Sequence, residues 1–162
     1  MFHFIDCIFI EICQPGQRNI IIGCVYRPPN TDQTLFNSEM ITLLNMLDSE
    51  KNKLILLSGD FNADLLNHAN HALTGDFLNA MLSHLMYPVI RNPTRVTEKS
   101  STLIDNIFIN CSQNVFEAVI ICNDLSDHFP VAAITLETKN NKRKFESLTK
   151  KRVFDSKSTQ TF

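Results

Sequence analysis

The chain has 162 residues, of which 44% are apolar, enough for one domain with a buried core. No stretch reaches the roughly 18–20 apolar residues that a membrane span needs, and the apolar start carries acidic residues without a basic leader, which argues against a secretory signal. The net charge of −2 divides into −8 for residues 1–138 and +6 for residues 139–162, so the acidic body can attract a polyanion only with bound cations. Thus no membrane partner is predicted.

Six segments are predicted to form strands, because each is a short β-branched or aromatic run bounded by turn residues: 4–13, 19–26, 53–58, 103–109, 115–121 and 131–136. Residues 34–47 and 75–86 are predicted to be helical, because apolar residues recur there every three or four positions. This order predicts a layered α/β or α+β sheet domain over residues 1–138. Residues 139–162, where the apolar pattern has stopped, are interpreted as a basic polar tail or linker that can contact nucleic acid or stay solvated.

The five cysteines are an odd number, and no two form a CxxC pair. Most of them lie in or beside apolar runs, so we interpret them as buried, reduced thiols rather than a zinc site. Reduced thiols favour an intracellular protein of the nucleus or cytoplasm.

The most specific local motif is an apolar strand that runs directly into GDFN (59–62). Reactive groups in open sheets collect where strands end, and Asp60 and Asn62 can point the same way because strand side chains alternate. A carboxylate can orient and deprotonate water, and an amide can hold that water without adding charge. The alternative interpretation is an Asx-rich turn after a core strand.

A second pattern combines Asp127 and His128, just before a predicted strand, with Asp105 inside an apolar one. A buried carboxylate is costly unless it is hydrogen-bonded, and an imidazole nitrogen of His128 would meet that need for Asp105. Such a pair fixes the tautomer of the imidazole and raises its basicity. The alternative is a loop with a surface histidine. Ahead of both patterns, Tyr26 and Arg27 end a strand, where Tyr26 can bond a phosphate or merely cap the sheet, and Arg27 can pair with phosphate bidentately.

Four segments occur in the order VYRPP, SGDFN, STLIDNIF and SDHFP, with NPTR (92–95) between the second and the third. In this order and spacing they resemble the successive motifs of the endonuclease/exonuclease/phosphatase superfamily, and especially those of LINE-type (non-LTR) retrotransposon endonucleases. The resemblance covers about residues 3–138. It implies a partial four-layered α/β sandwich, with mixed, largely antiparallel sheets flanked by helices, of which this chain would hold the later elements.

Carried over position by position, the resemblance implies catalytic roles for five residues. Asp60 would activate or position the attacking water, and Asn62 would help to hold that water and the phosphate. His128, oriented by Asp105, would contact the scissile phosphate and steady its developing charge. Tyr26 would support that phosphate.

The resemblance also implies a Mg²⁺ or Mn²⁺ cofactor, with Asp127 at the metal centre. Phosphate or nucleic-acid contacts are expected from Arg27, Asn62 and Arg95. The implied partners are DNA and a reverse transcriptase domain in the parent polyprotein.

One departure from the family pattern bears on activity. The N-terminal half of these proteins supplies an early Asn and a metal-binding Glu, whereas only 25 residues precede Tyr26 here, and their only acids are Asp6 and Glu11. We therefore expect an incomplete domain with an exposed sheet edge. Three functions are consistent with the sequence: a metal-dependent, DNA-nicking endonuclease of a retroelement, a catalytically inactive remnant of one, and a small-molecule or lipid phosphoesterase of the same superfamily.

Overall fold

A computed structural model describes residues 3–111, 116–123 and 125–135, so the expected tail at 139–162 lies outside the described residues. The main body is a five-stranded sheet with the order β1-β2-β3-β7-β4. Its strands are β1 (Asp6–Ile12), β2 (Ile20–Tyr26), β3 (Leu54–Asp60), β7 (Asp105–Ile109) and β4 (Tyr87–Pro88). The neighbours β2 and β3 run parallel, and the other three neighbouring pairs run antiparallel.

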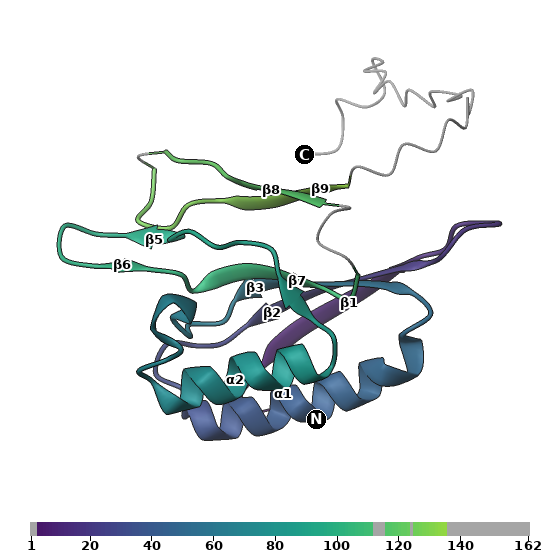
Figure 1. The fold of residues 1–162 in the computed structure, drawn as a ribbon, viewed down its shortest axis with the longest axis horizontal. Coiled ribbons are helices and arrows are strands. Elements are labelled where there is room, and N and C mark those ends of the chain that lie inside the picture. Colours follow the sequence, from purple (N-terminus) through teal and green to yellow (C-terminus); the bar gives the residue numbers. More distant parts are fainter. Residues whose placement is uncertain (1–2, 112–115, 124, 136–162) are drawn as a thin grey trace, which may run out of the picture.

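Two helices, α1 (Gln33–Leu47) and α2 (Ala72–Ser83), cover one face of this sheet (Figure 1). The first is the crossover that a parallel β2–β3 pair requires. Asp32 precedes it as the N-cap, and its side chain accepts hydrogen bonds from the backbone N–H groups of Thr34 and Leu35. Two 3-10 helices, η1 (Asp48–Glu50) and η2 (Leu65–Asn67), lie in the connections that follow α1 and β3.

The core between the helices and the sheet is built around four phenylalanines. Phe77 of α2 packs against Phe36, Phe61 and Phe108, with ring centroids 5.7, 5.4 and 5.8 Å away, and all four rings are almost fully buried. Because the four rings come from α1, α2, β7 and the turn after β3, their packing fixes the end of β3 against both helices.

Two hairpins lie over the opposite face of the sheet (Figure 1). One joins β5 (Arg95–Val96) to β6 (Ser101–Thr102), and the other joins β8 (Phe116–Ile120) to β9 (Val131–Thr135). Ile120 and Val131 pack against the main core, so the second hairpin is part of the domain. The helical layer, the central mixed sheet and the strands above it confirm the expected partial α/β sandwich.

The six predicted strands and two predicted helices are all present within a few residues of their expected bounds. The short strands β4, β5 and β6 were not predicted, because two residues are too few to form a recognisable β-branched or aromatic run. The expected burial of the thiols is wrong for Cys7, Cys13, Cys24 and Cys122, which are exposed. Cys7 lies in the edge strand β1 and Cys24 on the open face of β2, while Cys13 and Cys122 lie just past the ends of β1 and β8, where an apolar sequence does not ensure burial.

The edge strand β1 leaves much of its apolar surface in contact with solvent. Ile8 and Ile10 are 67% and 55% exposed, and they lie on the sheet face opposite the helices. Among the described residues, no helix is both long enough and apolar enough to cross a membrane.

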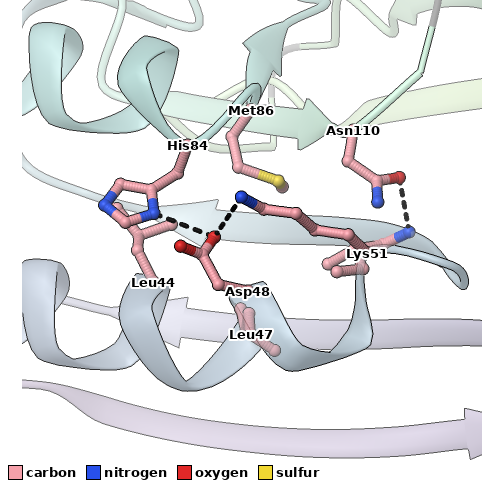
Figure 2. Close-up of a pocket in the computed structure, with 8 residues that line it drawn as sticks. Leu44, Leu47, Asp48, Lys51, His84, Met86 and Asn110 are labelled. Atoms are coloured by element: carbon pink, nitrogen blue, oxygen red, sulfur yellow. Dashed lines mark hydrogen bonds and ion pairs between the residues drawn. The ribbon is translucent and has the colours of Figure 1, made fainter.

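A polar cluster joins the C-terminal ends of the two helices (Figure 2). Asp48, just after α1, accepts hydrogen bonds at 3.0 Å from the His84 imidazole and from the Lys51 ammonium group. The cavity beside this cluster has a volume of only about 10 Å³, room for a single water molecule. We therefore interpret the cluster as a structural link between the helices and not as a substrate site.

Candidate metal and phosphate site

The candidate site lies where β3 ends and β7 begins. Asp60 is the last residue of β3 and Asp105 the first of β7, and the two are direct partners in the antiparallel register. Tyr26, the last residue of β2, is the parallel partner of Asp60, so the three side chains leave the same face of the sheet. This is the face opposite the helices, where the hairpins lie.

His128 reaches these strand ends from the segment between β8 and β9. Its Nδ1 lies 3.1 and 3.3 Å from the two carboxylate oxygens of Asp105. A carboxylate only accepts, so Nδ1–H donates and Nε2 is left for another ligand. One ligand atom from each of Asp60, Asp105 and His128 falls within 4.8 Å of the other two, the spacing of groups that can share one cation.

Backbone pairing with β5 holds His128 in place. His128 forms an isolated antiparallel bridge with Arg95, and the N–H of Phe129 donates to the carbonyl of Thr94 at 2.7 Å. Thr94 is completely buried, and its hydroxyl oxygen accepts from the backbone N–H of Asp105 at 3.0 Å. Thr94 thus links the histidine segment to the strand that carries its carboxylate partner. The sequence reasoning missed this role, although NPTR contains the residue.

The two carboxylates lie in an environment that favours a bound cation. Like charges directly opposite each other on paired strands repel. Burial, reinforced by the neighbouring Asp105 charge, raises the pKa of the Asp60 carboxyl above its usual value. A divalent cation held by the two carboxylates would relieve both effects, and carboxylate oxygens suit Mg²⁺ and Mn²⁺ alike.

Asn62, two residues after Asp60, has a left-handed backbone conformation, with a φ of 47°. Its backbone N–H donates to a carboxylate oxygen of Asp60 at 2.9 Å, and its side-chain nitrogen donates to the carbonyl of Arg27 at 2.7 Å. The amide oxygen of the Asn62 side chain is therefore the atom left for water or substrate. This oxygen accepts hydrogen bonds, which suits contact with a water molecule better than contact with an anionic phosphate.

The structure does not place every expected site residue at the cluster. Asp127 points instead to Arg95, whose Nε donates to its carboxylate at 2.8 Å, and both side chains are more than 40% exposed. Arg27 is buried, 5% exposed, and its guanidinium donates to backbone carbonyls. Tyr26 is 43% exposed beside Asp60.

Replacing Arg95 with glutamine tests how this outer pair is held. The Arg95 hydrogen bond is the main reason that the pKa of Asp127 lies below its usual range. We expect Arg95→Gln to raise that pKa towards 3.8, as followed by carbon NMR of the carboxyl group, with little change in stability because the pair is exposed. A lowered pKa stabilises the fold above the unfolded value and loses that effect as the pH falls, so the stability difference between the two proteins should vanish in acid. An unshifted Asp127 would contradict this pairing.

Comparisons with known proteins point to one family. A family model described as "Endonuclease-reverse transcriptase" matches residues 20–132. No curated protein is similar enough in sequence to count as a match.

Solved structures share the fold at low identity. The endonuclease domain of TRAS1, a telomere-specific non-LTR retrotransposon, superposes with a TM-score of 0.63 and 13% identity over 82% of this chain and 64% of that chain. An endonuclease/exonuclease/phosphatase family protein from Leptotrichia buccalis gives 0.57 and 20%, over 80% and 53%. A beta toxin from Staphylococcus aureus with bound magnesium ions gives 0.60 and 14%, over 80% and 57%. The chain thus spans between about half and two thirds of the length of these structures.

Proposed function

We propose that this chain, which belongs to the endonuclease–reverse transcriptase family of endonuclease/exonuclease/phosphatase proteins, is part of a metal-dependent phosphodiesterase domain that nicks DNA for a retroelement. The observation that carries this proposal is the convergence of Asp60, Asp105 and His128 where β3 ends and β7 begins. The three residues come from separate segments of the chain, and only the fold brings them together.

The proposed chemistry follows from the atoms that each residue presents. When bound at the cluster, a divalent cation would supply Lewis-acid polarisation of a phosphate oxygen. Asp60 would hold the attacking water and accept its proton, while the side-chain oxygen of Asn62 accepts a second hydrogen bond from the same water. His128, fixed through Nδ1 by Asp105, presents Nε2, which in the protonated ring donates to the phosphate and steadies its charge.

We further propose supporting roles for the surrounding residues. Tyr26 lies beside Asp60 with its side chain exposed, in a position to bond the same phosphate. Arg95 and Asp127 form a partly exposed pair beside the cluster, and we propose that on substrate binding Arg95 contacts the DNA backbone while Asp127 turns to the metal. The basic residues 139–162 would add affinity for DNA, with a reverse transcriptase domain as the partner in the parent polyprotein.

Nicking of supercoiled plasmid tests the proposal. We expect relaxed product in Mg²⁺ or Mn²⁺, no product in a chelator, and a loss of about 100-fold or more in His128→Ala, as for the removal of one donor to a developing oxyanion. His68→Ala is the matched control, because within the described part of the chain the His68 ring bonds only the backbone carbonyl of Leu65, in η2. Equal nicking by both variants would contradict the site.

Two further measurements, hydrolysis of soluble phosphoesters and the thermal midpoint in Mg²⁺, separate the alternative functions. Hydrolysis of soluble phosphoesters without any nicking would favour a small-molecule or lipid phosphoesterase. An unchanged thermal midpoint in Mg²⁺, together with no activity on either substrate, would favour an inactive remnant. The motif order and the basic residues 139–162 favour the DNA substrate.

A further inference from the structure

Arg27 is a buried cation whose hydrogen bonds go to neutral groups. Its Nη1 donates to the carbonyl of Asn62 at 2.8 Å, and its Nη2 donates to the carbonyl of Thr31 at 3.2 Å. Its guanidinium carbon lies 5.4 Å from the centroid of the Phe36 ring. Burying a charge is costly, and a guanidinium enclosed in this way has little surface left to offer a phosphate. Arg27 therefore has a structural role and not the phosphate contact expected from the sequence.

That role is visible in the reciprocal hydrogen bonds between Arg27 and the turn after β3. The backbone N–H of Arg27 donates to the carbonyl of Asp60 at 3.0 Å. The side chain of Asn62 donates to the carbonyl of Arg27, and the guanidinium of Arg27 donates back to the carbonyl of Asn62. Together these three bonds tie residue 27 to both ends of the Asp60–Asn62 turn.

The turn needs such support, because Asn62 has the left-handed φ of 47°. A non-glycine residue in this region is strained and persists only where its surroundings hold it. The turn also aims Asp60, whose carboxylate accepts from the N–H of Asn62. If the turn relaxed, the carboxylate of Asp60 and the amide oxygen of Asn62 would both lose their direction.

We infer that Arg27 is a positioning residue, whose buried guanidinium locks the Asn62 turn and so aims Asp60 and Asn62 at the metal and phosphate site. This inference rests on the proposed function for its consequence but not for its geometry. The guanidinium is required because its planar fork reaches two carbonyls at once, which a lysine ammonium on a single flexible stem does not reproduce.

The test compares Arg27→Met with Arg18→Met in the whole chain. Arg18 also donates to three backbone carbonyls, those of residues 51–53, but it is exposed and lies at the opposite end of β3. Two readouts are taken at a temperature where both variants are folded: hydrogen exchange of the Asn62 backbone and side-chain amides by NMR, and the affinity for Mg²⁺ alone by calorimetry. We expect Arg27→Met to speed Asn62 exchange and to weaken Mg²⁺ binding about 10–100-fold, as for other groups that support metal ligands. Arg18→Met should change neither the Asn62 exchange nor the Mg²⁺ affinity. Arg27→Lys should fall between Arg27→Met and the wild type in both.

The outcomes separate this inference from the proposed function. Faster Asn62 exchange in Arg27→Met, in a chain that binds no Mg²⁺, would support the positioning role while removing the metal site. Asn62 exchange equal to wild type in Arg27→Met would overturn the inference, whatever happens to Mg²⁺. If Arg27→Met does not fold, the scalar coupling across the hydrogen bond from Asn62 Nδ2 to the Arg27 carbonyl decides in the wild-type chain. Its absence would overturn the inference, and its presence with faster Asn62 exchange in Arg27→Lys would support it.

Discussion

Replacing Gly59 with alanine is expected to prevent the domain from folding. Gly59 has a φ of +156°, and a Cβ built on it would lie 1.7 Å from the carbonyl oxygen of Val25. Val25 is the register partner of Gly59 in the parallel β2–β3 pair, so the obstacle is backbone inside the sheet and not a side chain that can rotate away. To remove this overlap, β2 and β3 must separate at their C-terminal ends, which carry Tyr26 and Asp60.

The size of this effect follows from the marginal stability of domains, about 5–15 kcal/mol in total. An overlap of this depth with a paired strand cannot be absorbed at the roughly 1–3 kcal/mol that overpacking usually costs. We expect Gly59→Ala to give a poorly dispersed amide NMR spectrum and no cooperative thermal transition. Gly16→Ala is the matched control, because Gly16 also has a positive φ, of +72°, but nothing lies within 4 Å of the added Cβ.

The control should lose only the strain of a left-handed alanine, roughly 1–2 kcal/mol. If Gly59→Ala melts cooperatively near the temperature of Gly16→Ala, the close approach of β2 and β3 at the candidate site is wrong. That result would also remove the geometric basis for placing Tyr26 beside Asp60.

Much of the fold could be predicted because its signals are local. Short β-branched or aromatic runs between turn residues identified the long strands, and a three-to-four-residue apolar spacing identified both helices, while the strand–GDFN junction marked the end of β3. The short strand β4 depends on pairing with β7, far away in the chain, whereas β5 and β6 pair locally but are two residues long, too short for a pattern to mark them. The same limit explains the exposed thiols, because an apolar strand does not reveal whether anything covers its second face.

The candidate site was only partly predictable for a similar reason. The partnership of His128 with Asp105 follows from the need of a buried carboxylate for a donor, and the structure brings the two together. Asp127 was expected at the metal, but it lies at a bend outside any strand, where no alternation sets the direction of a side chain, and it pairs with Arg95. Arg27 was expected to face phosphate. Two prolines follow it, and no period indicates the direction of a side chain at such a turn. The catalytic roles of all these residues stay predictions.

Asparagine in place of Asp60 is expected to abolish cleavage and at the same time to stabilise the fold at neutral pH. The activity should fall by about 10²–10⁴-fold, the usual contribution of a positioned general base, because an amide cannot accept the proton of the attacking water. Asn keeps an oxygen that can accept from the N–H of Asn62, so the turn after β3 is retained. Plasmid nicking and thermal unfolding of the same samples measure both effects.

The gain in stability follows from the raised pKa of Asp60, which is due first to burial. A carboxyl whose pKa is higher in the folded than in the unfolded chain favours folding when protonated, and this advantage is lost as the pH rises through the folded-state pKa. At pH 7 the charge therefore opposes folding, and Asp60→Asn removes it. Below 3.8, the usual value, Asp60 is protonated in both states, and the difference between the two proteins should vanish.

Divalent metal should reverse this order. A ligand that binds only the folded state raises its stability by mass action, so Mg²⁺ should raise the thermal midpoint of the wild-type chain and have much less effect on Asp60→Asn. Asp76→Asn, on the exposed face of α2, serves as the matched control and should follow the wild type in all three measurements. A variant at position 60 that is less stable at pH 7, or equally stabilised by Mg²⁺, would contradict the cluster of Asp60, Asp105 and His128 as a metal site. The GDFN turn needs only a hydrogen-bond acceptor at position 60, which Asn also supplies. A charge there that destabilises the fold without metal and stabilises it with metal therefore distinguishes a functional carboxylate from a residue that only forms the turn.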